Sequence, residues 1–505
     1  MVNVIVQLSK YLITLLMVLF TVQSFLALRE RDEEERSYIL EKQILMILLM
    51  NFICFFVMYL QEREFYITKM CLCTLGYLLG VQVVYRLLFK KASMILLNNM
   101  CMLLCIGLIM LTRLNAARAE TQFKIIVIST LLSFIVPVII RKVKILKDLT
   151  WLYGIAGLLM IGAVLVLAVT SRGAKLSIQF GGENGFTFQF SEFVKITLVF
   201  FMAGMLREDN SFRKVVITTV VAALHVLILV ASTDLGTALV YFVAYVVVIY
   251  LATRKPVYPL LGLGGMAVAC VAAYFLFSHV RTRVQVWRDP FSNYDAGYQV
   301  IQALFGLSSG GWFGTGLFEG SPTSIPLATK DATFCAICEE MGVIFGICLI
   351  LLCMSMFLLI VNISMKMNKR FYKLIAMGLG SEYAIQVFLT IGGITKFIPL
   401  TGITLPLVSY GGSSMLCTIL MFSIIQGLYI LREDEGEALA KRNKQKRKKS
   451  KTTAKTGSGP ADKTSGNAGR KKPQPTGRGT GRTDLPEEDD LGRRIEEQTE
   501  KSLRW

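Results

Sequence analysis

Apolar runs of about 17 to 25 residues recur along the chain, and each is long enough to cross about 30 Å of hydrocarbon. Hydrophobic residues make up 54% of the 505 residues and charged residues only 18%, whereas a typical soluble domain carries about 25% charged residues. The runs lack the short polar–apolar alternation of a membrane β-barrel. The sequence therefore predicts an all-α polytopic membrane protein.

Thirteen membrane spans are expected, at residues 11–28, 43–60, 69–89, 94–112, 123–140, 151–170, 190–206, 214–232, 236–252, 258–279, 333–361, 372–392 and 405–431. Arg and Lys residues cluster in alternate loops, as the positive-inside rule requires of cytoplasmic loops. This pattern predicts an outside N-terminus and a cytoplasmic C-terminal tail. The first run lacks a convincing cleavage site and is expected to remain as a helix.

The composition separates a membrane-embedded part, residues 1–431, from a polar tail, and long outer loops are expected at 171–189 and 280–332. The second loop is too apolar and aromatic for a disordered tether, so short amphipathic helices on the membrane surface are expected there. Residues 432–505 are rich in Lys, Arg, Gly, Ser, Pro and Glu, which predicts a disordered basic tail.

The charge and the cysteines exclude several function classes. Much of the net charge of +19 lies in Lys441–Lys449 and the tail after it, which favours contact with anionic lipid and no nucleic acid. The eleven cysteines lie mostly in apolar runs, and Cys335-x-x-Cys338 has no second ligand pair, so a structural role is expected. There is no Walker loop or dinucleotide fingerprint. The chemistry is expected on the outer face, where ATP is absent.

Ionisable residues at membrane depth are costly, so each is a candidate functional residue. Glu192 and Lys195 share one helical face, either as a local ion pair or as the lining of an outward cavity. Asp234 lies between two spans, where an N-cap is the favoured role. The glycines of Ser409–Ser414 permit close helix approach or an unwound turn. Asp331 on its own would be an ordinary N-cap of the next helix.

Five segments, taken in order, strongly resemble the SEDS family of bacterial cell-wall polymerases (FtsW, RodA, SpoVE). They are STDLGTAL, RTRVQVWRDPF, GYQVIQALFGLSSGGWFGTGL, ATKDATFCAICEEMG and LPLVSYGGSS. The resemblance covers about residues 97–431, the family's ten-helix core. It implies that residues 93–431 form this core and that residues 1–92 form an N-terminal three-helix membrane extension outside it. It implies peptidoglycan glycosyltransferase activity on lipid II in the bacterial cytoplasmic membrane, with a class B penicillin-binding protein as transpeptidase partner.

The resemblance implies that Asp331 is the essential catalytic carboxylate, since TKDATF stands where the family commonly has TDFIF. A carboxylate there can act as general base on the sugar hydroxyl that attacks the anomeric carbon. The departing lipid pyrophosphate requires cations, supplied by Arg, Lys or a divalent metal such as Mg or Mn. Arg281 and Arg283 match the family's Arg-x-Arg and are the first candidates, followed by Lys195 and Lys330.

Further candidate substrate contacts are Glu192, Tyr298, Gln299, Ser409, Gly411, Gly412 and Ser413. Glu339 and Glu340 match the family's Glu-Glu-x-Gly and lie about 12 Å from Asp331 along a helix, too far for an acid–base dyad. With Asp234 they are interpreted as structural or cavity-lining residues. At least one of them is expected to pair with a basic or hydroxyl group of a neighbouring span.

The chain departs from the family pattern at Ser177, Phe190, Thr390 and Lys396, which indicates a divergent branch. The changes affect the expected substrate contacts of the first outer loop and the expected partner docking, but not Asp331. Two alternatives use the same residues. One is a lipid II flippase, and the other is a non-catalytic scaffold that activates a penicillin-binding protein.

Overall fold

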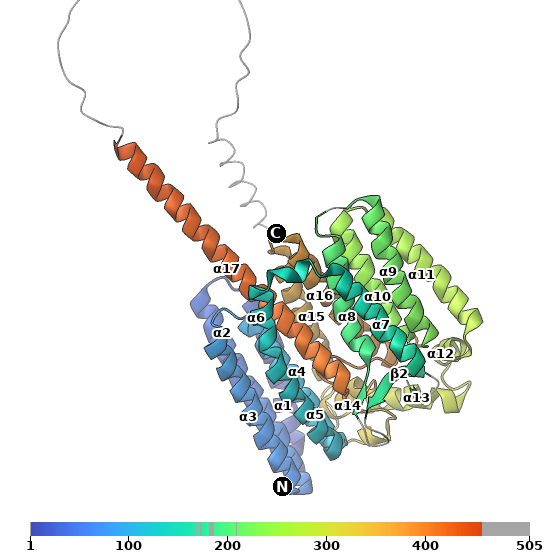
Figure 1. Ribbon diagram of the computed structural model, residues 1–505. Helices are drawn as coiled ribbons and strands as arrows, with labels where there is room; N and C mark the ends of the chain where they lie inside the picture. The colour runs from blue at the N-terminus through green and yellow to red at the C-terminus, as the bar shows by residue number, and fades with distance from the viewer. Residues whose placement is uncertain (1, 168, 172–173, 181–185, 209, 457–505) are drawn as a thin grey trace, which may run out of the picture. The chain divides into compact units, whose positions relative to one another are not determined.

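The computed structural model describes residues 2–167, 169–171, 174–180, 186–208 and 210–456, and Figure 1 shows a bundle of long helices within residues 1–441. The extension consists of α1 (Val2–Arg29), α2 (Glu33–Glu62) and α3 (Phe65–Leu88). The first half of the core comprises α4 (Met94–Leu114), α5 (Ala116–Ser133), α6 (Ile135–Lys142), the 3₁₀ helix η1 (Lys144–Lys147), α7 (Thr150–Leu167), α8 (Phe190–Met205), α9 (Phe212–Ala231), α10 (Leu235–Thr253) and α11 (Val257–Leu276). The second half comprises α12 (Ser278–Arg288), α13 (Tyr294–Ser309), the 3₁₀ helix η2 (Pro322–Ser324), α14 (Thr333–Met341), α15 (Val343–Met365), α16 (Arg370–Ile394) and α17 (Gly412–Thr456).

The predicted spans agree with the helices, with one difference in length. Twelve helices in the described part of the chain are long and apolar enough to cross a membrane, and α5 with α6 counts as one of them. The predicted span at 190–206 is α8, whose 16 residues reach only about 24 Å. It is almost wholly buried between its neighbours, so its apolar sequence reflects burial in protein as well as contact with lipid.

The extension is an integral part of the helix bundle. Ser24 of α1 donates a hydrogen bond to Asn99 of α4 at 2.9 Å, and Asn99 in turn donates to Ser355 of α15 at 3.0 Å. Around this buried polar chain, Met17 and Phe20 of α1 are completely buried. Interiors packed in this way resist displacement, so α1 provides a fixed surface at the core.

The predicted span at 333–361 is wrong as a single helix, because the chain breaks at Gly342. This residue has φ +90° and ψ 163°, a conformation that only glycine adopts readily. An added Cβ would lie 2.5 Å from the backbone nitrogen of Gly314, so the close approach of another segment also requires glycine. The break separates the wholly buried nine-residue α14 from the spanning helix α15.

The two outer loops contain regular structure. In the first, β1 (Val169–Ser171), β2 (Ala174–Phe180) and β3 (Phe186–Phe188) form an antiparallel sheet in the order β1-β2-β3. The second contains α12 and α13, which confirms the prediction of short helices. Figure 1 places β2, α12, α13 and α14 toward the same end of the bundle as the N-terminus.

The prediction that the tail is disordered from residue 432 is wrong up to Thr456, because α17 continues to that residue. The segment after Leu431 is rich in Glu, Ala and Lys, which are strong helix formers, and it extends a helix that has already begun. Asp434 pairs with Lys91 and Arg141 at 2.9 and 2.7 Å. Two of the predicted cytoplasmic loops therefore meet the start of the tail at one end of the bundle. Residues 457–505 lie outside the described residues, and their disorder stays a prediction.

Candidate active site

Asp331 is buried at the N-terminal side of α14, with an exposed fraction of 6%. Gln299 of α13 donates a hydrogen bond from Nε2 to Asp331 Oδ1 at 3.0 Å. The N-cap position of α14 is Ala332, not Asp331, so the ordinary capping role does not account for this carboxylate. An amide on a neighbouring helix thus orients a buried acid, and the structure brings together two of the predicted site residues.

Of the two predicted arginines, only Arg283 lies close to the carboxylates. It is half-buried and donates a hydrogen bond to the carbonyl oxygen of Thr401 at 3.3 Å. Burial lowers the pKa of the Arg283 guanidinium, and the negative charges of Asp234 and Asp331 act in the opposite direction. Arg281 is exposed on a different face of α12, because residues two apart do not share a helix face. Arg283 is therefore the better candidate for a ligand phosphate.

The capping role predicted for Asp234 is confirmed. Its Oδ1 accepts a hydrogen bond from the backbone N–H of Thr237 in the first turn of α10, at 3.2 Å. Its Oδ2 accepts one from Ser191 Oγ at 3.4 Å. Burial raises the pKa of the Asp234 carboxyl. Asp234 therefore connects the starts of α8 and α10 next to Arg283.

Glu192 and Lys195 form the predicted local ion pair, at 2.6 Å. Lys195 also donates to Gln386 Oε1 on α16 at 3.0 Å. Glu382, which the sequence analysis missed, is completely buried on α16, and neither of its carboxylate oxygens has a hydrogen-bond partner among the described residues. Its position inside the predicted span 372–392 was a signal that could have found it, because an ionisable residue at membrane depth is costly. Glu192, Lys195 and Glu382 thus place two carboxylates and one ammonium group in the interior of the core.

The segment at 409–413 joins several elements around α14. Ser409 Oγ donates to Thr333 Oγ1 at 3.1 Å, and Ser413 Oγ accepts from the backbone N–H of Gln189 at 2.9 Å. The backbone N–H of Gly411 donates to Gln122 of α5 at 3.3 Å, and Gly412 begins α17. These contacts are structural, and the substrate contacts predicted for the segment stay predictions.

Tyr298 and Lys330, two further predicted contacts, are both exposed. Tyr298 packs its ring against Tyr294 at a centroid distance of 5.6 Å on α13. Arg118 of α5, which the sequence analysis missed, donates to Thr329 Oγ1 at 2.6 Å, two residues before Asp331. Arg118 is one of several basic residues at span ends, and nothing in the sequence distinguished it from the others.

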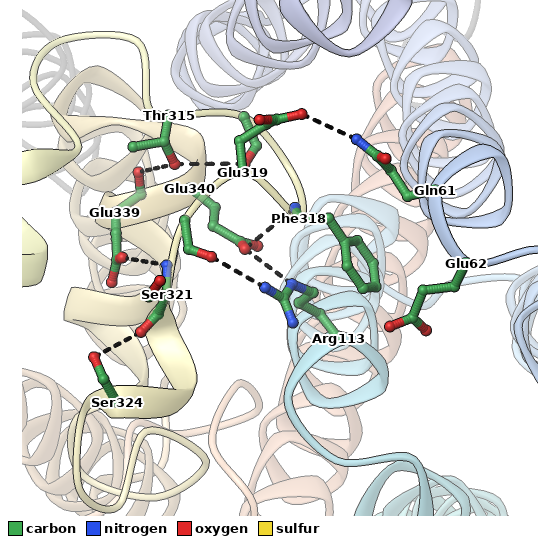
Figure 2. Close-up of polar contacts among 12 residues, drawn as sticks. Gln61, Glu62, Arg113, Thr315, Phe318, Glu319, Ser321, Ser324, Glu339 and Glu340 are labelled. Carbon is green, nitrogen blue, oxygen red and sulfur yellow. Dashed lines mark hydrogen bonds and ion pairs between the residues drawn. The ribbon is translucent and has the colours of Figure 1, made fainter. Parts of the chain in front are cut away.

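The prediction that Glu339 or Glu340 pairs with a basic group is confirmed. Glu340 is completely buried, and its Oε1 lies 2.9 Å from Nε of Arg113, at the end of α4. Figure 2 shows the Glu340 carboxylate joined to both the Arg113 guanidinium and the backbone N–H of Phe318. Glu339 instead accepts a hydrogen bond from the backbone N–H of Ser321 at 2.7 Å. Both carboxylates therefore support the loop that precedes Asp331.

The residues around Asp331 are a poor donor set for a divalent cation. Among the described residues, no group of three or more His, Cys, Asp or Glu side chains lies close enough together to hold a metal ion. Asp331 has an amide and a guanidinium as neighbours, where Mg²⁺ prefers several oxygen ligands. A divalent cation stays a prediction from the sequence, and no step is assigned to it.

The four residues that depart from the family pattern lie at the first long loop and around the C-terminal end of α16. Ser177 lies in β2, and Phe190 starts α8 with its ring 5.0 Å from that of Phe188. Thr390 is buried in α16, where its hydroxyl donates to the carbonyl oxygen of Gln386 at 2.9 Å. Lys396 lines a small cavity together with Arg283. The last of these changes thus lies beside Arg283, one of the predicted site residues.

The fold and the site define a polytopic helical membrane protein with a buried carboxylate, Asp331, that an amide of α13 orients. The FtsW/RodA/SpoVE family, described as cell cycle protein, matches residues 92–433. The chain belongs to this family. The match begins after α3, so the N-terminal extension lies outside the matched residues.

Relatives and a solved structure agree with this membership. The chain is 32% identical over 387 residues to the peptidoglycan glycosyltransferase RodA of Mycobacterium leprae, covering 69% of this chain and 82% of the relative. It is 37% identical over 295 residues to RodA of Mycobacterium tuberculosis, covering 54% of this chain and 62% of that one. One solved structure concerns the coordination of polymerization and crosslinking by a peptidoglycan synthase complex. A chain of that structure superimposes on this chain with a TM-score of 0.58 at 22% sequence identity, and the match covers 68% of this chain and 98% of that one. This last likeness shows the fold.

Proposed function

We propose that the chain, as a peptidoglycan glycosyltransferase, polymerises lipid II at the outer face of the bacterial cytoplasmic membrane, with Asp331 as the general base. The observation that carries the proposal is the buried Asp331 carboxylate, which Gln299 orients at 3.0 Å and Arg283 attracts. Asp331 removes the proton from the sugar hydroxyl of one substrate as that oxygen attacks the anomeric carbon of the other. In an inverting displacement the leaving pyrophosphate departs from the opposite face of the ring.

Arg283 is the proposed partner of the departing pyrophosphate. An arginine forms bidentate, charge-assisted hydrogen bonds with phosphate oxygens. Arg283 has its backbone on α12, whereas Asp331 directly precedes α14. The base and the cation thus come from different elements, which allows them to contact different groups of one substrate complex.

The partner proposed for this chain is a class B penicillin-binding protein that crosslinks the strands it makes. The support comes from the synthase complex to which the fold is similar, in which polymerization and crosslinking are coordinated. The proposed orientation places α12, α13 and α14 outside the cytoplasmic membrane, since the basic loops with Lys91 and Arg141 gather at the other end, by Asp434.

The proposal is tested with the purified full-length chain and lipid II in proteoliposomes. We expect glycan strands, detected by gel separation after labelling. Movement of the lipid II head group across the bilayer without polymer would instead support a flippase. Neither polymer nor translocation, in the presence of the cognate penicillin-binding protein, would favour the scaffold.

Replacing Gln299 by leucine is expected to lower kcat by a factor of about 10 to 100, because a hydrogen bond to a charged group contributes about 1.5–3 kcal/mol. The KM for lipid II should change little, since Gln299 acts on Asp331 and not on the pyrophosphate. Steady-state polymerisation kinetics measure both constants. A rise in KM at constant kcat would show that Gln299 contacts the substrate instead.

A further inference from the structure

Residues 310–321, called here the capping loop, cover the C-terminal end of α14. The backbone N–H of Thr315 donates to the carbonyl oxygen of Glu339 at 2.9 Å, and that of Gly316 donates to the carbonyl oxygen of Glu340 at 3.0 Å. The last carbonyls of a helix have no partner inside the helix, so the loop supplies the hydrogen bonds that α14 lacks.

The carboxylates of α14 reach back to the same loop. Glu339 accepts the N–H of Ser321 at 2.7 Å and Glu340 accepts that of Phe318 at 3.2 Å, as Figure 2 shows. Gly314 has φ +82°, and an added Cβ there would lie 2.1 Å from the carbonyl oxygen of Glu340. The loop and the helix end are therefore in direct backbone contact, and a shift of one displaces the other.

The N-terminal extension holds the outer side of the capping loop. Lys10 of α1 donates to the carbonyl oxygen of Gly314 at 3.3 Å. Gln61, in the last turn of α2, donates to Glu319 Oε1 at 3.0 Å (Figure 2). The ring of Tyr11 packs on that of Phe313, at a centroid distance of 5.1 Å. Two helices that lie outside the family match thus contact the loop at several places along its length.

We propose that the extension is a built-in clamp on the capping loop, and that Lys10 and Gln61 are positioning residues for Asp331. The inference rests on the catalytic role proposed for Asp331. α14 is short and wholly buried, with the capping loop at one end and Asp331 just before the other. A misplacement of about 1 Å in a catalytic group costs up to about 100-fold in rate, so the position of α14 affects the rate through Asp331.

The extension is itself anchored to the core. α1 is anchored to the core by its buried apolar residues and by the hydrogen bonds from Ser24 to Asn99 and onward to α15. Thr21 of the same helix also donates to the carbonyl oxygen of Cys348 at 3.4 Å. The contacts of Lys10 and Gln61 therefore connect the loop to the packed core through a route separate from α14.

The test compares full-length variants in two measurements. The double variant Lys10→Met, Gln61→Leu is expected to lower kcat about tenfold with little change in KM, and to speed hydrogen exchange of the amides at 314–321. Lys10→Arg, which keeps the donor, should behave as wild type. The matched control is Lys42→Met, because Lys42 is exposed on α2, about 28 Å along the helix from Gln61.

An unchanged kcat in the double variant overturns the proposal, whatever the exchange rates show. Unchanged exchange of the capping loop overturns it as well, since Lys10 and Gln61 then do not hold the loop in place. The catalytic role of Asp331 is decided separately, by Asp331→Asn. If that variant polymerised normally, the proposed function would fail while the exchange data still reported on the clamp.

Discussion

Asp331→Asn is expected to lower polymerisation by a factor of about 100 to 10,000, the usual contribution of a general base. Asparagine has nearly the same size, and its side-chain oxygen can still accept the hydrogen bond that Gln299 donates at 3.0 Å. The variant therefore keeps nearly the same side-chain volume next to α14, and it loses the negative charge and with it the ability to take a proton. The measurement is the initial rate of glycan synthesis from lipid II by the purified chain.

The matched control is Asp295→Asn, since Asp295 is an exposed aspartate in the first turn of α13, on the same outer loop. It should polymerise at the wild-type rate. Binding of lipid II to Asp331→Asn should be preserved, because Arg283 and the rest of the site are unchanged. A rate for Asp331→Asn within a factor of three of wild type would remove this carboxylate from the mechanism.

The sequence predicted the helices well, because their signal is local. A run of about twenty apolar residues has to find a hydrocarbon or protein interior, and α4, α10 and α16 begin within a few residues of their predicted starts. The same property explains the error at α14. The run from 333 to 361 is apolar throughout, and the break at Gly342 depends on the approach of Gly314 from another segment.

The partners of the site residues were harder to predict than the residues themselves. Asp331 and Gln299 were named from the sequence through the resemblance, but their hydrogen bond joins helices that only the fold brings together. Glu340 was expected to pair with a cation, yet Arg113 stands 227 positions away and has no local signature. Burial decides such pairs, since an isolated charge in the interior must find a partner.

The contacts of the extension were also hard to predict from the sequence. Hydropathy predicted three helices before the core, and the structure contains them, but their contacts with the capping loop use single polar side chains at helix ends. Lys10 and Gln61 resemble ordinary interfacial residues in the sequence. Only their position against a loop that caps α14 gives them a role to test.

Arg113→Met is expected to destabilise the protein by about 3–5 kcal/mol, because it leaves a completely buried carboxylate without its cation. Glu340 must then stay charged with the N–H of Phe318 as its donor, or take up a proton. The guanidinium also lies 4.1 Å from the ring centroid of Phe318, so its removal loosens the capping loop. The measurement is the apparent melting temperature of the detergent-purified chain.

Two variants separate the lost ion pair from a merely smaller side chain. Arg113→Met combined with Glu340→Gln should recover most of the stability, because no charge is left buried and the amide oxygen still accepts from Phe318. Lys69→Met breaks a pair with Glu120 whose side chains are 52% and 46% exposed, and it should cost about 1 kcal/mol or less. Two outcomes would show that the Arg113–Glu340 pair is not what stabilises this end of α14. One is an equal melting temperature for Arg113→Met and Lys69→Met, and the other is a double variant that is less stable than Arg113→Met alone.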